Sequence, residues 1–517
     1  MSTFPWLTTL MVVPLVGSVI VVLLPKGRGL LAKQVTLLIS LITLGLTVAM
    51  SLQFQADAKE PFQFVESHPW IPSFGISYSV GVDGIGLVLV ALAATLVPIV
   101  VIAGWNDVDE NARGTVKGYF ALILALETLM IGVFAATDVF LFYVFFEAML
   151  IPVYFMIGRF GGAQRSYAAV KFLLYSLIGG LFMLASLIGL YVVSAQLTGT
   201  GTFDFLALTG LEIDETTQKM LFLGFFFAFA VKAPLWPFHT WLPDAAAEAK
   251  PGTAVLLIGV LDKVGTFGMI RYCLPIFPAA SSFYAPVVIG MALIGIFYGA
   301  FVALGQNDMK RLFAYSSMSH FGFIALGIFV FTSQGQSGSV VYMVAHGLST
   351  AGLFLAAGFL MSRNRGSQLI SDYEGVNKTA PVLAGFFLIA ALSSLALPGM
   401  ISFIGEFLVL LGAFERYMWV GALATLGIVI TAAYVLRLYQ KSMTGPLKPG
   451  LEGMKDLGGR EITALVPIAA LTIILGIFPA PILNVVNPAV DRVMNSIGAT
   501  DPAPTVALAG TVEGSDK

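Results

Sequence analysis

Two lysines, Lys232 and Lys263, stand in the middle of long apolar stretches of the chain. A charged side chain at the centre of a membrane helix costs about 2.5–3.5 kcal/mol on insertion scales, so such residues are usually retained for moving protons or ions. Four further ionisable residues stand in apolar stretches in the same way: Glu147, His320, His346 and Glu406. Carboxyl, amine and imidazole groups all bind and release protons. The six residues therefore predict a proton pathway.

Glu147 lies in FYVFFEAMLIPVYF, without a polar neighbour for several residues, and it needs a partner on another helix. We expect Lys232 to be that partner, since a pair 4 Å apart gains about 4 kcal/mol at an effective dielectric constant near 20. The alternative is a static salt bridge that only holds helices together, although buried ion pairs stabilise less well than apolar packing. Lys263, if it lacks a strong acid partner, is expected to exchange its proton.

The two histidines have small hydroxyl residues close by in sequence, in AYSSMSHFGF and YMVAHGLSTAGLF, which favours a proton relay. The alternative for each is a structural hydrogen bond. Three secondary candidates complete the set: Glu127, Asp262 and His239. Of these, Asp262 precedes Lys263 and points about 100° away from it on a helix, and His239 is expected to make a structural hydrogen bond. Asp138, at the boundary of a span, is expected to cap a helix or to lie at the membrane interface.

Metal and cofactor chemistry are not expected within this chain. No His, Cys or Glu cluster has the spacing of metal ligands. The single cysteine, Cys273, cannot form an internal disulfide or hold an iron–sulfur cluster. The sequence also has no phosphate loop, dinucleotide fingerprint or nucleophile elbow.

The elements that must position these side chains are membrane helices. Of 517 residues, 58% are hydrophobic and 11% charged, with a mean hydropathy of +0.90. Apolar runs of about 20 residues, enough to cross a hydrocarbon core, recur along the chain. They predict an all-α polytopic membrane protein with about fourteen transmembrane helices. These lie near residues 6–25, 30–54, 80–105, 115–136, 138–158, 166–196, 219–243, 252–277, 284–304, 311–332, 338–361, 380–410, 417–440 and 462–486.

The charged residues outside these spans orient the chain. Most of the 27 lysines and arginines, Lys310 and Arg311 among them, fall in connections that follow odd-numbered spans. Because basic residues concentrate on the cytoplasmic side, both termini are predicted on the outer, positive side of the membrane. The net charge of −2 gives no indication of nucleic-acid binding. Residues 55–79 are expected to form a polar and aromatic loop.

Two of the predicted spans are interrupted beside candidate residues. Pro234 and Pro237 follow Lys232, while Pro398 and Gly399 precede Glu406. Proline removes a backbone donor, and bare backbone groups are tolerated at membrane depth only inside protein or beside water. A matched pair of broken helices is typical of inverted-repeat transporters. The alternative is that prolines are simply common in membrane helices.

The spacing between the two interrupted spans predicts two inverted five-helix repeats, made of spans four to eight and spans nine to thirteen. The expected divisions are an N-terminal three-helix segment (1–110), the first repeat (111–278), the second repeat (279–442), a C-terminal span with its flanking segments (443–497) and a disordered tail (498–517).

Four long segments carry a family resemblance: FFEAMLIPVYFMIG, KAPLWPFHTWLPDA, KRLFAYSSMSHFGF and LPGMISFIGEFLVL. With them nearly the whole chain resembles the antiporter-like proton-pumping subunits of respiratory complex I, the NADH:quinone oxidoreductase, and in particular the chain 4 (subunit M) family. That resemblance implies two inverted half-channels joined by a central charged axis. It implies that Glu147 and Lys232 are the coupling pair and Lys263 the central connector. It places His320 and His346 along the second half and makes Glu406 the acceptor near the outer exit.

The resemblance also implies an assembly. FMN, iron–sulfur clusters and the quinone site belong to partner subunits, and the partners include sister antiporter-like subunits in a bacterial plasma membrane. Similar chains occur in multisubunit cation/proton antiporters and in ferredoxin-driven relatives of complex I, which remain the alternatives. Glu406 favours chain 4, because the sister proteins usually have lysine there. The chain departs from the family at Asp262, often an apolar residue, and around Ala247, where a histidine is common.

Overall fold

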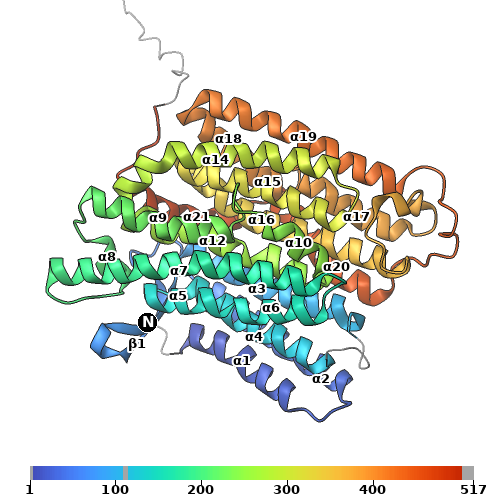
Figure 1. Cartoon of the computed structure of the whole chain (residues 1–517), viewed down its shortest axis with the longest axis horizontal. Helices are drawn as coiled ribbons and strands as arrows, with labels where there is room; N and C mark the ends of the chain where they lie inside the picture. Colours follow the sequence, from blue (N-terminus) through green and yellow to red (C-terminus); the bar gives the residue numbers. More distant parts are fainter. Residues whose placement is uncertain (1–3, 109–114, 504–517) are drawn as a thin grey trace, which may run out of the picture.

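A bundle of nearly parallel helices forms the body of the protein (Figure 1). The computed structural model describes residues 4–108 and 115–503. Twelve helical stretches in this described part are long and apolar enough to cross a membrane, which confirms a polytopic membrane protein. Ten of them are single helices, of which only α3 is extended by a short turn: α1 (Trp6–Leu23), α2 (Gly29–Ser51), α3 (Gly84–Ala103), α4 (Val116–Ala135), α7 (Arg165–Thr198), α14 (Pro278–Gly305), α15 (Met309–Phe329), α16 (Ser333–Arg363), α19 (Met418–Met443) and α20 (Gly459–Ile477).

The other two stretches change helical geometry along their length. One is interrupted at Met149, between α5 (Val139–Ala148) and α6 (Leu150–Phe160). The second, Pro251–Ile276, is completely enclosed by the rest of the protein. It consists of α11 (Pro251–Leu256), η3 (Leu257–Leu261), α12 (Lys263–Gly268), η4 (Met269–Cys273) and α13 (Leu274–Ile276). Both η3 and η4 are wider π-helical turns, a geometry that often occurs at functional sites.

Two of the expected spans are interrupted near mid-length. The first consists of α9 (Glu215–Lys232) and α10 (Trp241–Glu248), and the second of α17 (Pro381–Ser394) and α18 (Ile401–Arg416). Pro234 and Pro237 lie in the first interruption, and Pro398 and Gly399 in the second. Gly399 has a φ of 96°, which a residue with a side chain rarely adopts. These elements account for the two expected spans outside the twelve long apolar stretches.

Several elements differ from the sequence-based expectations. The predicted loop at 55–79 is wrong, because β1 (Gln63–Ile71) and β2 (Ile76–Val82) form an antiparallel hairpin around η1 (Pro72–Phe74). The last span ends at Ile477 rather than near 486. It is followed by α21 (Ala480–Ser496), whose buried side chains recur every three to four residues. The remaining short helices are η2 (Gly104–Asn106), α8 (Phe205–Thr209), η5 (Ile370–Asp372) and η6 (Val376–Lys378).

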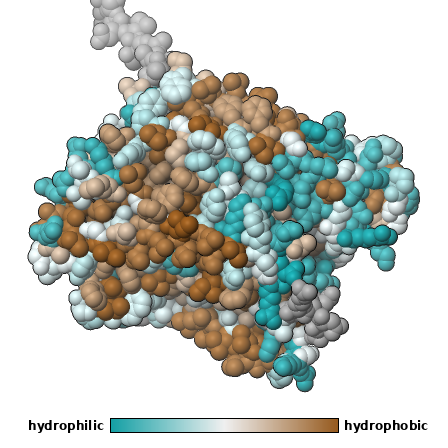
Figure 2. Space-filling view, in the orientation of Figure 1, coloured by the Kyte–Doolittle hydropathy of each residue, from teal (hydrophilic) through white to brown (hydrophobic). Residues whose placement is uncertain are grey.

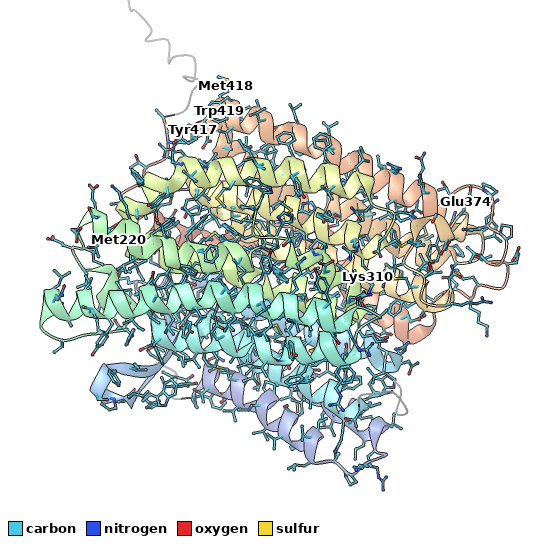
Figure 3. All side chains as sticks on the ribbon, in the orientation of Figure 1. Met220, Lys310, Glu374, Tyr417, Met418 and Trp419 are labelled. Atoms are coloured by element: carbon cyan, nitrogen blue, oxygen red, sulfur yellow. The ribbon has the colours of Figure 1, made fainter. Side chains whose placement is uncertain are left out.

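The surface separates into an apolar side and a polar end. Figure 2 shows hydrophobic residues over the side of the bundle and hydrophilic residues gathered at one end. Exposed apolar side chains recur along α1, α2 and α7, as expected of helices that face lipid. In Figure 3, Glu374 marks the polar end, while Met220 and Trp419 lie at the opposite end.

The first and last described segments lie at the same end of the bundle, away from the polar end, and the first of them lies beside the β hairpin (Figure 1). The backbone N–H of Leu7 donates to Glu66 of the hairpin at 2.8 Å, and the backbone N–H of Ser333 donates to Asp501 at 2.7 Å. Of the tail predicted to be disordered, residues 504–517 lie outside the described residues.

Candidate functional site

One helix, α16, forms the centre of the candidate site. Its central part is buried on all sides, and it carries Tyr342, His346 and Thr350 at intervals of four residues. Residues four apart in a helix lie on the same face. The three polar side chains therefore form one line through an otherwise apolar helix. That line meets η3 and α12 on one side and α15 and α18 on the other.

Lys263 contacts His346 directly. Its Nζ lies 2.6 Å from His346 Nδ1 and 2.5 Å from the carbonyl oxygen of Ile258 in the π-helical turn η3. A charged lysine can only donate, so His346 then accepts at Nδ1 and carries its own proton at Nε2. That Nε2 lies 3.3 Å from Thr350 Oγ1. The lysine is fully buried, and its apolar surroundings include the ring of Phe321, 5.1 Å from Nζ.

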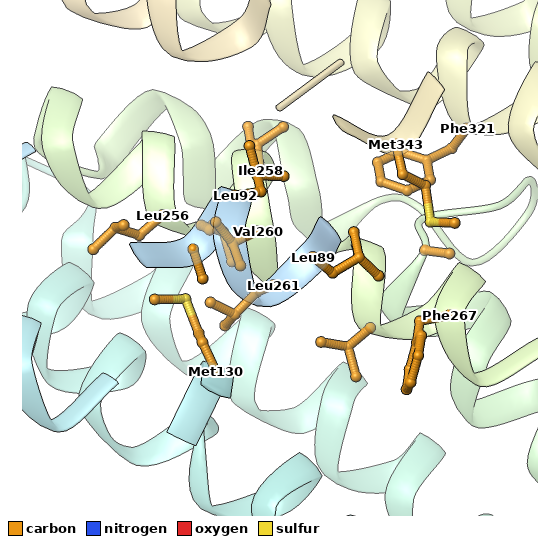
Figure 4. Close-up of a cluster of buried hydrophobic side chains, with 14 of the residues drawn as sticks. Leu89, Leu92, Met130, Leu256, Ile258, Val260, Leu261, Phe267, Phe321 and Met343 are labelled. Carbon is orange, nitrogen blue, oxygen red and sulfur yellow. The ribbon is translucent and has the colours of Figure 1, made fainter. Parts of the chain in front are cut away.

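Two glycines explain why the lysine and the histidine can meet. A Cβ added to Gly347 would lie 2.8 Å from the carbonyl oxygen of Gly259 and 2.8 Å from Leu92. The backbones of α16 and η3 are therefore in direct contact at this crossing, as small residues allow in membrane helices. Figure 4 shows the packed apolar side chains around it, including Leu92, Ile258 and Phe321.

His320, on α15, is linked to Glu406, on α18, through a tyrosine that the sequence reasoning missed. The Oη of Tyr342 lies 2.5 Å from His320 Nδ1 and donates to Glu406 Oε2 at 3.2 Å. All three side chains expose 3% or less of their surface. Tyr342 precedes His346 by four residues, and this spacing is the signal that could have identified it.

The two histidines join these hydrogen-bonded groups. The rings of His320 and His346 lie 5.4 Å apart between centroids, in contact but without a direct hydrogen bond among the described residues. The Nε2 of His320 lies 3.1 Å from Ser316 Oγ, which in turn lies 2.6 Å from Tyr434 Oη. Ser394, at the interruption between α17 and α18, comes within 3.4 Å of the same Nε2.

Lys232 and Asp262 are buried near this line but are not hydrogen-bonded to it. The Nζ of Lys232 has no hydrogen-bond acceptor in the described part of the chain and lies 4.8 Å above the ring of Phe146. Both carboxylate oxygens of Asp262 are likewise buried without a protein donor. The two residues interact electrostatically, and Asp262 also interacts with Lys263. A negative charge between two lysines reduces the cost of burying them.

Glu147 lies within electrostatic range of Lys232, but no ion pair of 4.0 Å or less joins them among the described residues. The direct pair assumed from the sequence is therefore absent from this conformation. Glu147 is only partly buried, and its carboxylate lies against Gly180 of α7, where an added Cβ would come within 1.6 Å of Oε1. The neighbouring Gly179 packs against Ala228 of α9. The glycine pair thus lets α7 contact both charge-bearing helices closely.

The secondary candidates lie apart from the hydrogen-bonded line. Glu127 is fully buried in α4, and neither of its oxygens has a protein partner in the described residues. The ring of His239 stacks edge-on against Tyr298 and Tyr315, and its Nδ1 also has no described partner, so the expected structural hydrogen bond is not found at that atom. The expected cap is found at Asp138, which accepts from the backbone N–H of Leu141 at 2.9 Å.

The position of Lys310 differs from the one expected from the sequence. It was placed among the basic residues of a connection, but it is buried at the start of α15. Its Nζ donates to the carbonyl oxygens of Ala247 and Ala249 at 2.6 and 2.8 Å, which caps the end of α10. Figure 3 shows Lys310 within the bundle, nearer its polar end. Within the described residues, no group of three or more His, Cys, Asp or Glu side chains could hold a metal ion.

Comparison with known proteins places this arrangement in a family. Residues 136–431 match the family described as NADH:quinone oxidoreductase/Mrp antiporter, transmembrane. The NADH-quinone oxidoreductase subunit M of Mycobacterium tuberculosis is 53% identical, over 98% of this chain and 97% of that protein. The NADH-ubiquinone oxidoreductase chain 4 of Arabidopsis thaliana is 39% identical, over 94% and 97%.

Two solved structures have the same fold as this chain. A chain of respiratory complex I from Thermus thermophilus with bound NADH is 33% identical and superposes with a TM-score of 0.86, over 95% of this chain and all of that one. A chain of the Mrp complex from a Dietzia species is 20% identical with a TM-score of 0.85, over 96% and 100%, and so shows a shared fold. The chain belongs to the NADH:quinone oxidoreductase/Mrp antiporter family of membrane proteins. Its likeness to subunit M and chain 4 confirms the branch indicated by the sequence.

Proposed function

We propose that this chain moves protons across the membrane as a membrane-arm subunit of an NADH:quinone oxidoreductase. The observation that carries the proposal is the buried line of titratable groups, from Lys263 and His346 to His320, Tyr342 and Glu406. Keeping such groups in a membrane interior is costly. Apolar side chains would pack there at no such cost, so the line is best explained by transport.

Each candidate takes a role along this path. Glu147 and Lys232 form a coupling pair whose separation changes during turnover. Lys263 is the connector between the two halves, while His320 and His346 carry the proton through the second half. Glu406, beside the interruption at Pro398 and Gly399, is the acceptor near the outer exit. Glu127, Asp262 and His239 have supporting roles, with Asp262 adjusting the charge around the two lysines.

The repeat organisation is part of the proposal. The interruption between α9 and α10 and that between α17 and α18 each stand beside one of the charged candidates, Lys232 and Glu406. We assign them to two inverted repeats, 111–278 and 279–442, flanked by the segments 1–110 and 443–497.

The redox chemistry belongs to partner subunits in this proposal. FMN, iron–sulfur clusters and the quinone site lie there, and sister antiporter-like subunits share the membrane arm. Support comes from the relatives, which are subunits of NADH-quinone oxidoreductases, and from the neighbour within complex I. The location is a bacterial plasma membrane, with both termini on the outer side.

Two alternatives are weaker. A cation/proton antiporter subunit without a redox partner is disfavoured by sequence identity, which is 20% to the Mrp chain but 53% and 39% to the NADH dehydrogenase subunits. A ferredoxin-driven relative shares the fold, and purification with a flavin-containing NADH-oxidising module distinguishes it from the proposed complex.

The test replaces Lys263 by alanine in the intact complex. Lys263→Ala removes the connector, and we expect NADH-driven proton uptake by inverted membrane vesicles to be lost, together with most quinone reductase activity. Lys219→Ala is the matched control, because that lysine is partly exposed, pairs with Glu215 at 3.2 Å and lies 4.2 Å from the ring of Phe283. Normal pumping by an assembled Lys263→Ala complex would refute the proposal.

A further inference from the structure

Tyr342 touches two titratable side chains at once. Its hydroxyl lies 2.5 Å from His320 Nδ1 and 3.2 Å from Glu406 Oε2, and the side chain is almost completely buried. A buried tyrosine needs only one hydrogen-bond partner for its hydroxyl. Here both partners are proton carriers of the proposed path, and they come from two different helices, α15 and α18.

The packing fixes the tyrosine between its partners. A Cβ added to Gly405, the neighbour of Glu406, would lie 2.7 Å from the backbone of Tyr342. A Cβ added to Gly338, one turn earlier on α16, would lie 2.7 Å from Val409 of α18. Two glycines at one crossing bring α16 and α18 into backbone contact, as small residues do in membrane bundles. This crossing places Glu406 beside the tyrosine hydroxyl.

No hydrogen bond joins His320 directly to Glu406 among the described residues. Their only shared hydrogen-bond partner there is the tyrosine hydroxyl. The other ring nitrogen of His320 faces Ser316 and Ser394, on the side away from Tyr342. A proton that leaves His320 at Nδ1 therefore meets this hydroxyl first.

We propose that the hydroxyl of Tyr342 carries the proton between His320 and Glu406, an inference that rests on the proposed function. In the step, the N–H bond of protonated His320 breaks as an O–H bond forms on Tyr342. At the same time the original O–H bond of Tyr342 breaks, and a new one forms on the Glu406 carboxylate. Imidazolium and carboxylate become imidazole and carboxylic acid, and the tyrosine returns to its neutral form.

A hydroxyl suits this position because it accepts and donates at once. Phenylalanine has the same ring and would fill the same space without the relay atom. The substitution Tyr342→Phe therefore separates the relay from packing. Tyr119→Phe is the matched control, because Tyr119 is equally buried and forms one hydrogen bond, to Thr253 at 3.1 Å, away from the charged line.

The experiment introduces both variants into the intact complex and measures assembly, NADH-driven proton uptake and quinone reductase rate. We expect Tyr342→Phe to assemble normally and to lose about a hundredfold or more in proton-coupled turnover, the lower range for removing a positioned proton-transfer group. Tyr119→Phe should remain within about twofold of the unmodified complex. Equal rates in the two variants would overturn the relay.

A second measurement reports on the hydrogen bond between Tyr342 and Glu406. We expect redox-induced infrared difference spectra of the intact complex to contain a carboxylic acid C=O band that Glu406→Gln abolishes. We expect Tyr342→Phe to shift this band, because the hydroxyl contact to Glu406 is lost, while Tyr119→Phe leaves it in place. An unshifted band would overturn the proposal even if Tyr342→Phe failed to assemble in quantity. Full pumping by Glu406→Gln would instead reject the proposed function as well.

Discussion

The two halves of the candidate path are built differently. In the second half, Lys263 contacts His346, and His320 contacts Glu406 through Tyr342, all by hydrogen bonds of 2.5–3.2 Å. In the first half, Lys232, Asp262 and Glu147 carry polar atoms without any protein partner in the described residues. The charges there interact only through space.

This difference indicates that the two halves of the path have different roles. The hydrogen bonds from Lys263 to His346, and from His320 through Tyr342 to Glu406, pass a proton with little movement of heavy atoms, so the second half is suited to conduction. The ring contact between the two histidines is the step without a direct hydrogen bond among the described residues. A charged pair held apart can close or open, and each change alters how strongly both groups hold their protons. The first half is therefore suited to control, with Lys263 at the junction. Predictions that disturb one half at a time test this comparison.

Of two glycine substitutions, one in each half, the larger effect is expected at the crossing that joins Lys263 to His346. In Gly347→Ala the new Cβ would lie 2.8 Å from the carbonyl oxygen of Gly259, and that backbone atom cannot turn away. The helices must separate, which stretches the contact between lysine and histidine. We expect NADH-driven proton uptake to fall by about ten- to a hundredfold, as for other small displacements of reacting groups.

Gly290→Ala is the control for this substitution. Gly290 lies in α14, and no atom of the described residues comes within 4 Å of a Cβ added there. Both variants add one methyl group to a membrane helix, but only Gly347→Ala should reduce pumping. If Gly347→Ala pumps as well as the control, the close crossing is not needed for conduction.

A smaller effect is expected in the first half. In Gly180→Ala the new Cβ would lie 1.6 Å from Glu147 Oε1, but that carboxylate ends a flexible side chain and can rotate. A displaced rotamer costs about 0.5–1.5 kcal/mol, so we expect about a two- to tenfold loss of proton uptake with normal assembly. Gly385→Ala, in open space on α17, is the control. A loss larger than that of Gly347→Ala would reverse the proposed roles of the two halves.

Much of the helical layout could be predicted from the sequence. Apolar length alone placed α7 at 166–196, against the observed Arg165–Thr198, and prolines indicated both interrupted spans. The hairpin of β1 and β2 was missed because its strands are mixed in polarity and do not alternate regularly between apolar and polar residues. The boundary between α20 and α21 was missed because the apolar run continues past Pro479, where the chain turns.

The side-chain network was less predictable. A lone charge in an apolar run is conspicuous, so Lys263 and Glu406 were found from residue type and position. Tyr342 was not, since tyrosine is ordinary in membrane helices and its role depends on a crossing of α16 and α18. The separation of Glu147 from Lys232 could not be predicted either, because the sequence shows which charged residues are present but not the distance between their atoms.

The central claim is that titratable groups, rather than polar packing, carry the proton to the outer side. It is tested most directly by comparing Glu406→Asp with Glu406→Gln in inverted vesicles of the intact complex. Aspartate keeps a titratable carboxyl on a shorter side chain, whereas glutamine keeps the shape without the proton site. We predict substantial NADH-driven proton uptake with Glu406→Asp and almost none with Glu406→Gln. Equal uptake by the two variants would contradict the account.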